Sequence, residues 1–151
     1  MRARRFGVVI GIAAAALWAP VASAAIPVTT ITINSVFGGV ETFTATGGVV
    51  CDSGTAVTDP IYFAGGGVQG RGVFTFHLVK TLTCDDGSGT FKLLVDAAAS
   101  PTSGGTVGGF AAGQGTGDYV GLRGGGSLVG TSFPDGSGIT DVYTGRLTIA
   151  P

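Results

Sequence analysis

The sequence predicts an all-β protein, an antiparallel barrel of about eight strands, with a β-sandwich as the alternative. Apolar and polar residues alternate in several short runs, as they do in strands with one buried face. Gly-rich turns separate these runs, and no stretch after residue 24 shows sustained helical spacing. Many of the 29 glycines lie inside the runs themselves. Glycine permits the bends and bulges of a tightly curved sheet, which favours the barrel.

Residues 1–24 predict a secretory signal peptide. Three arginines precede an apolar stretch from Phe6 to Ala19, Pro20 ends that stretch, and Ala22-Ser23-Ala24 supplies the small residues of a cleavage site. We therefore expect cleavage near Ala24 and a secreted protein, extracellular or in the cell envelope, in which residues 25–151 form one domain. The apolar stretch is short for a bilayer span, so a retained anchor is the less favoured alternative.

The charge of the chain excludes some partners. The full sequence carries a formal net charge of −1, and loss of the three arginines with the signal peptide leaves −4. A nucleic-acid-binding domain needs a basic surface, so nucleic acid is not an expected partner. Mild acidity likewise disfavours adhesion to anionic lipid. No stable membrane span is expected after processing.

The first strands are predicted over residues 26–36, which are rich in Thr, Ile and Val, and over residues 40–51, interrupted by Gly47-Gly48. A short strand includes residues 61–63. Residues 72–84 and 90–98 form the clearest predicted hairpin, joined by an acidic Gly turn at 85–89. In its first strand, one face carries Phe74, Phe76, Leu78 and Leu82, and the other carries Thr75, His77, Thr81 and Thr83. Phe91, Leu93 and Val95 continue the apolar face in the second strand.

Three further strands are predicted in the last third of the chain. They cover residues 106–112, 127–133 and 139–149, and a second acidic Gly turn at 134–138 joins the last two. In the last strand, Tyr143, Leu147 and Ile149 share one face, while Thr140, Thr144, Arg146 and Thr148 share the other. The spacing of about 10–15 residues between strands is typical of barrels and sandwiches.

The two cysteines, Cys51 and Cys84, predict one disulfide. An even count in an exported chain favours pairing. Each cysteine ends an apolar run and precedes an acidic Gly turn, so the bridge would join the ends of neighbouring strands. A redox-active pair is disfavoured because no Cys-x-x-Cys spacing occurs.

Residues 115–126 carry the pattern Gly-x-Gly-x-Tyr-x-Gly-x-Arg-Gly, with Tyr119 and Arg123. This segment resembles the late hairpin of the allene oxide cyclase and dirigent barrels, and small exported bacterial proteins that share that barrel. In the bacterial proteins a turn like the one from Cys84 to Phe91 often precedes it. The resemblance implies an eight-stranded barrel with a mouth and a largely apolar interior. No residue set here matches the polar interior groups of the plant proteins.

Few residues suggest chemistry. His77 is the only histidine, it lies on the polar face of its strand, and no Gly-x-Ser-x-Gly motif accompanies it. Residues 65–70 satisfy Gly-x-Gly-x-x-Gly, but a strand follows where a dinucleotide site needs a helix. One histidine and two cysteines cannot build a zinc cluster made only of Cys and His, and the acidic turns lack the ligand pattern of a calcium loop. No cofactor and no metal are expected.

The sequence thus favours a non-enzymatic exported barrel that binds a small apolar ligand or a surface partner. Tyr119 and Arg123 are the predicted ligand contacts, because their Gly-rich segment bends sharply and a guanidinium offers fixed donors to an acidic or carbonyl group. Two alternatives stay open. One is an isomerase or cyclase that acts in the barrel interior, and the other is a structural envelope protein. The oligomeric state and the ligand are not encoded in any motif.

Overall fold

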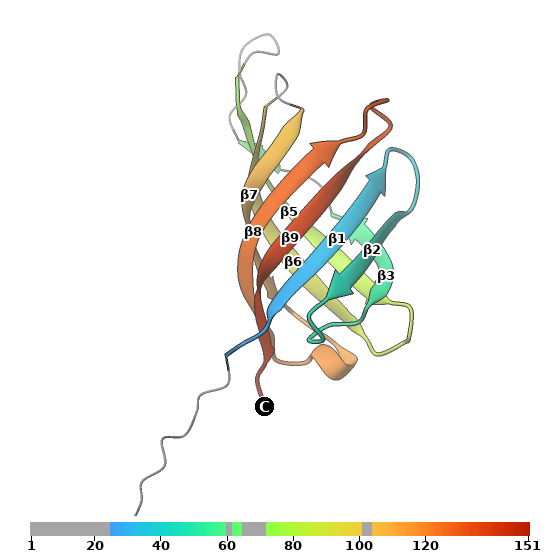
Figure 1. The fold of residues 1–151 in the computed structure, drawn as a ribbon, viewed down its shortest axis with the longest axis vertical. Helices are drawn as coiled ribbons and strands as arrows, with labels where there is room; N and C mark the ends of the chain where they lie inside the picture. The colour runs from blue at the N-terminus through green and yellow to red at the C-terminus, as the bar shows by residue number, and fades with distance from the viewer. Residues whose placement is uncertain (1–24, 60–61, 65–71, 101–103) are drawn as a thin grey trace, which may run out of the picture.

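The computed structural model describes residues 25–59, 62–64, 72–100 and 104–151, and these residues form a closed antiparallel barrel of eight strands (Figure 1). The predicted signal peptide at 1–24, the Gly-rich motif at 65–70 and the start of the predicted strand at 61–63 lie outside the described residues. Among the described residues, no helix is long and apolar enough to cross a membrane.

The strands follow one another around the barrel with few exceptions. Their bounds are β1 Val28–Val36, β2 Glu41–Thr46, β3 Ser53–Thr58, β4 Tyr62–Ala64, β5 Phe74–Cys84, β6 Thr90–Ser100, β7 Gly105–Gly113, β8 Leu122–Ser132 and β9 Gly138–Ile149. The order around the sheet is β3-β2-β1-β9-β8-β7-β6-β5, and pairing of β3 with β5 closes it. The short β4 pairs with β5 beyond the end of β3.

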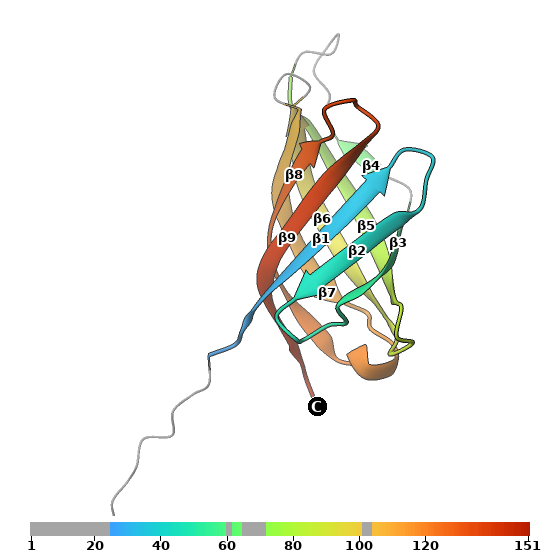
Figure 2. The ribbon, with the colours of Figure 1, turned by 45° about the vertical axis from the view of Figure 1, so that its right-hand side comes forward.

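Turns and termini divide the barrel into two ends (Figure 2). At one end lie the turns after β2 and β5 and the one-turn 3-10 helix η2 Gly117–Tyr119 between β7 and β8. We call this the disulfide end. At the opposite end lie the turns β1–β2 and β8–β9, and we call this the cavity end. The eight strands of the barrel run between these two ends. Inward-facing residues of the longer strands therefore lie near both ends.

The predicted hairpin and its alternation are confirmed. β5 pairs with β6 over ten residue pairs from Phe74↔Ala99 to Thr83↔Thr90. Leu78 and Leu82 are buried inside, while His77 is exposed on the outer face. In β9 the inward positions Tyr143 and Leu147 are buried, whereas Ile149 at the end of the strand is exposed.

Two predicted boundaries were wrong by several residues, and one strand was not predicted. β2 ends at Thr46 rather than at residue 51, and residues 53–58, for which no strand was predicted, form β3. The inward face of β3 begins with Gly54 and Ala56, which give no clear apolar alternation. Gly54 is required there, because a Cβ would overlap the Thr83 carbonyl and the Phe43 ring. β8 begins at Leu122 rather than at 127, because three consecutive glycines continue the pairing with β9.

Candidate functional site: a polar cavity in the barrel

The disulfide end of the barrel is filled. The Phe91 ring packs edge-on against Phe43 at 6.1 Å between centroids and against Tyr119 at 5.3 Å. Phe43 and Phe91 are fully buried, and Tyr119 is nearly so. Such closely packed aromatic rings fill the interior of the barrel between them.

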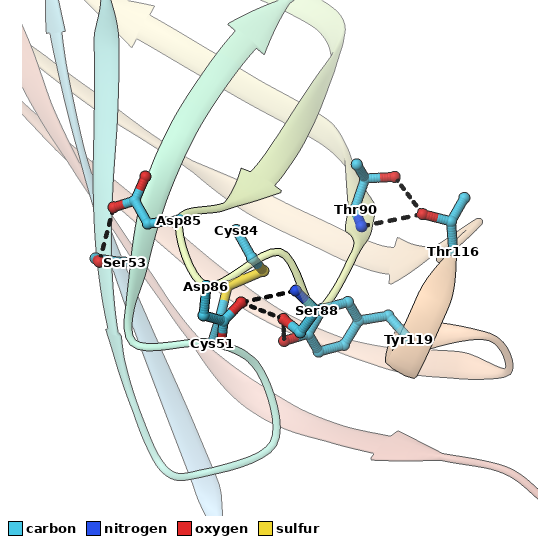
Figure 3. The surroundings of a disulfide bond; sticks show 9 residues. All are labelled: Cys51, Ser53, Cys84, Asp85, Asp86, Ser88, Thr90, Thr116 and Tyr119. Atoms are coloured by element: carbon cyan, nitrogen blue, oxygen red, sulfur yellow. Dashed lines mark hydrogen bonds between the residues drawn. A yellow bond between two sulfur atoms is a disulfide. The ribbon is translucent and has the colours of Figure 1, made fainter.

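The predicted disulfide between Cys51 and Cys84 is confirmed, with 6.0 Å between the Cα atoms (Figure 3). It joins the turn after β2 to the end of β5. Hydrogen bonds reinforce the same turns: Ser53 Oγ donates to Asp85 at 2.9 Å, and Ser88 Oγ lies 2.7 Å from the Tyr119 hydroxyl. The turns at this end are therefore tied to one another as well as to the core.

The two acidic Gly turns share one local structure. The backbone N–H and the hydroxyl of Ser88 both donate to Asp86 Oδ1, and Ser137 does the same to Asp135. These hydrogen bonds stabilise the ionised carboxylates and lower the pKa of Asp86 and of Asp135. An aspartate that accepts from the residue two positions later is an ordinary turn-forming arrangement. Among the described residues, no group of three or more His, Cys, Asp or Glu side chains could hold a metal ion.

The predicted ligand contacts, Tyr119 and Arg123, do not converge on a cavity. Tyr119 is buried at the disulfide end, where its hydroxyl meets Ser88 and its ring meets Phe91. Arg123 is exposed on β8, paired across the sheet with Thr148. Their ligand role stays a prediction. The cavity described below lies at the other end of the barrel.

The cavity end encloses a space of about 330 Å³ that all eight strands of the barrel line. Apolar side chains supply most of its walls, among them Phe76, Leu78, Val95 and Leu128. The last residue of β1, Val36, and the turn residues 37–39 also contribute. The apolar face predicted for the hairpin therefore serves both ends of the barrel. Phe91 packs at the disulfide end, and Phe76 borders the cavity.

A buried ion pair lies on the wall of this cavity. The Lys80 ammonium donates to Glu41 Oε2 at 2.9 Å and to Thr58 Oγ1 at 2.8 Å. The Thr58 hydroxyl in turn lies 2.9 Å from Glu41 Oε1. The side chain of Lys80 is 4% exposed and that of Glu41 is 20% exposed. Because β5, β2 and β3 each supply one member, closure of the barrel assembles this group.

A second polar group enters from β9 and β1. Asp141, Tyr143 and Ser35 line the cavity and are at least nine-tenths buried. Within the described part of the chain, Asp141 Oδ1 and the hydroxyls of Tyr143 and Ser35 have no hydrogen-bond partner. Asp141 and Tyr143 interact electrostatically, but the contact does not meet the geometry of a hydrogen bond.

Burial controls the ionisation of this second group. Burial raises the pKa of the Asp141 carboxyl. The positive charge of Lys80 partly opposes this rise, and the negative charge of Glu41 adds to it. Burial also raises the pKa of Tyr143, and the Asp141 charge adds to that effect. The neighbouring Gly130 leaves room for the carboxylate, because a Cβ there would overlap Asp141 Oδ1. A neutral Tyr143 hydroxyl can donate one hydrogen bond and accept another.

His77 lies outside the cavity. Its side chain is 59% exposed and its Nδ1 contacts Asp96 Oδ1 on the outer face of β5 and β6. The predicted outward orientation is therefore confirmed.

The sequence-based predictions did not include the charged residues that line the cavity. Lys80 falls on the apolar face of β5, between Leu78 and Leu82, and Asp141 falls two residues before Tyr143 on the inward face of β9. A charged residue in phase with buried apolar positions requires a partner inside the fold. That break in the alternation was the available signal.

The class defined by fold and site is a small disulfide-linked antiparallel barrel with a partly polar interior cavity. The chain matches no protein-family model, and comparison with curated proteins and with solved structures likewise finds no match. The resemblance to the allene oxide cyclase and dirigent barrels accordingly stays a prediction.

Proposed function

We propose that this protein is exported and binds one small, largely apolar molecule in the cavity end of its barrel, without chemical conversion. The observation that carries the proposal is the cavity of about 330 Å³ with apolar walls and a few convergent polar groups. Ligand pockets in proteins have this composition, and their volumes begin at about 300 Å³.

The two ends of the barrel support this assignment in different ways. The disulfide end supplies the rigid closed base, through its aromatic packing and the Cys51–Cys84 bridge. A binding site benefits when the walls are held by such a scaffold, because less ordering is needed when the ligand arrives. The disulfide also supports export, since disulfides persist in oxidising compartments.

The test compares two neighbouring residues of β8 that point to opposite sides of the wall. Leu128 is 2% exposed and lines the cavity, whereas Val129 is 55% exposed on the outside. The probe is N-phenyl-1-naphthylamine, a neutral apolar dye that becomes fluorescent in apolar surroundings. The wild-type protein and Val129→Trp should bind it, and Leu128→Trp should lose binding at least tenfold because the indole occupies the cavity.

Two results would overturn the proposal. If the wild-type protein does not bind the dye, the structural role moves ahead. If Val129→Trp loses binding and Leu128→Trp keeps it, the dye binds on the outer face. Thermal unfolding of both variants shows whether each is folded, and Leu128→Phe replaces Leu128→Trp if the larger side chain prevents folding.

An isomerase or cyclase is the second candidate, favoured by one observation. A buried carboxyl with a raised pKa beside a tyrosine hydroxyl, in an apolar cavity, is an arrangement suited to acid–base chemistry. Small molecules extracted from purified wild-type protein and from Asp141→Asn would separate the two functions. Identical molecules support binding alone. Molecules of the same mass but different retention time support isomerisation.

A further inference from the structure

The cavity contains polar groups that the protein itself leaves without partners. Asp141 Oδ1 and the hydroxyls of Tyr143 and Ser35 are buried and face a space that apolar side chains otherwise line. An unpaired buried polar group costs about 1–3 kcal/mol, so a ligand that completes these hydrogen bonds gains more than one that does not. The chemistry of these atoms therefore restricts the ligand, and the restriction rests on the proposed binding function.

Charge excludes one class of ligand. The Lys80 ammonium is neutralised by Glu41 at 2.9 Å and also donates to Thr58, and no other Lys, Arg or His lines this cavity among the described residues. Asp141 adds a further acidic group on the facing strand. A carboxylate ligand would bring a second anion beside Asp141 with no free cation to compensate, and like charges at close range in a buried site are strongly disfavoured.

Hydrogen-bonding capacity separates the remaining classes. Asp141 Oδ1, when ionised, requires a donor, whereas the Tyr143 and Ser35 hydroxyls can each donate as well as accept. An ammonium group can only donate, and removal of its full charge from water costs more free energy than removal of a neutral hydroxyl. An ether or ketone oxygen can only accept, so it leaves Asp141 Oδ1 without a donor. A hydroxyl group does both, so it can donate to Asp141 and accept from Tyr143 at once.

We infer that the barrel cavity selects neutral apolar molecules that carry a hydroxyl group, with Asp141, Tyr143 and Ser35 as the groups that recognise it. The alkyl or ring portion of such a molecule would lie against Phe76, Leu78, Val95 and Leu128. This reverses the ligand polarity that Arg123 suggested, because the cavity offers an acidic rather than a basic contact.

The experiment uses four probes of similar length that differ in the polar group: 1-octanol, methyl octyl ether, octylamine and octanoate. Each displaces N-phenyl-1-naphthylamine from the wild-type protein at pH 7. We expect 1-octanol to bind about tenfold more tightly than the ether, which keeps the acceptor but lacks the donor. Octylamine should be weaker than 1-octanol, and octanoate weakest of all.

Variants assign the preference to particular atoms. Asp141→Asn should reduce the octanol-to-ether ratio toward one, because only the alcohol can donate to Asp141. Tyr143→Phe should weaken the binding of both probes, because both accept from the Tyr143 hydroxyl. The matched control Thr144→Val, on the exposed face of the same strand, should leave the ratio and both affinities unchanged. Ser35→Ala should weaken the binding of both probes less than Tyr143→Phe does, since one of several hydrogen bonds is lost. The ratio does not depend on overall stability, so a structural defect alone would not produce this pattern.

The experiment tests ligand binding and hydroxyl selectivity separately. If the dye does not bind, the proposed function fails. If the dye binds but the ether or octanoate displaces it as well as 1-octanol does, binding stands and the hydroxyl selectivity is wrong. An unchanged ratio in Asp141→Asn, or unchanged affinities for both probes in Tyr143→Phe, would also overturn the inference, because ordered water could then satisfy these groups without the ligand.

Discussion

The two ends of this barrel are built from the same eight strands, but the interior is packed at one end and open at the other. At the disulfide end, Phe43, Phe91 and Tyr119 fill the space and a covalent bridge holds the turns. At the cavity end, the same strands leave about 330 Å³ open and place an ion pair and unpaired polar groups on its walls. The difference shows that close packing and open space are kept in separate halves of one small core.

The largest loss of stability is expected when aromatic packing at the disulfide end is removed. Phe91→Ala at the disulfide end should destabilise the fold by about 3–5 kcal/mol, the range for truncating a fully buried phenylalanine. Phe76→Ala, which borders an existing cavity, should cost distinctly less. Chemical denaturation of both variants measures the two values, and equal losses would show that the ends do not differ in packing.

The disulfide should provide the next largest contribution. The bridge closes a loop with a sequence separation of 33, for which loop-closure entropy corresponds to about 3–4 kcal/mol. The double variant Cys51→Ser/Cys84→Ser should lower the thermal midpoint accordingly, and so should reduction of the wild-type protein. Dye binding by the folded variant should persist, since neither cysteine lines the cavity. Loss of binding without loss of folding would show that the two ends are coupled.

Removal of one member of the ion pair at the cavity end should destabilise the fold more than replacement of both charged members. Lys80→Met leaves Glu41 and Thr58 without their shared donor and should destabilise the fold by about 1–3 kcal/mol. Adding Glu41→Gln should recover part of that loss, because the unpaired carboxylate is removed. A double-mutant cycle from denaturation data measures the coupling. Strictly additive effects would contradict a direct interaction.

Asp141 should give a smaller effect whose sign depends on pH. Its pKa is raised in the folded protein, so the folded state holds the proton more tightly than the unfolded state does. Stability from this group is present below its ordinary pKa near 3.8 and is lost as the pH rises through the raised value. Asp141→Asn should therefore raise the thermal midpoint at pH 7 relative to wild type, and the difference should shrink toward pH 3. A variant that is less stable at pH 7 would contradict the assignment.

The smallest effect is expected for the residues first predicted to contact a ligand. Arg123→Ala and Tyr119→Phe lie away from the cavity, so the dye should bind both variants with unchanged affinity. Tyr119→Phe should lose only the hydrogen bond with Ser88, about 1 kcal/mol of stability. If either substitution abolishes binding while the protein stays folded, the site lies at the disulfide end instead.

Local pattern was sufficient to predict much of the fold. The period-2 alternation in β5, β6 and β9 identified strands, faces and the central hairpin, because side chains in a strand alternate between the two sides of the sheet. The matching turns after Cys51 and Cys84 predicted their bridge. The strand β3 was not predictable in this way, since Gly54 and Ala56 are small because of what packs against them, not because of any signal of their own.

What the sequence determined by itself was the all-β class, the disulfide and the identity of the inward faces, since each depends on residues close together in the chain. What only the tertiary structure decided was the site. Glu41, Thr58 and Lys80 lie 17 to 39 residues apart and meet because β3 pairs with β5 and closes the barrel. Whether the interior is filled or open depends on the summed volume of side chains from all eight strands, and no single strand contains that information.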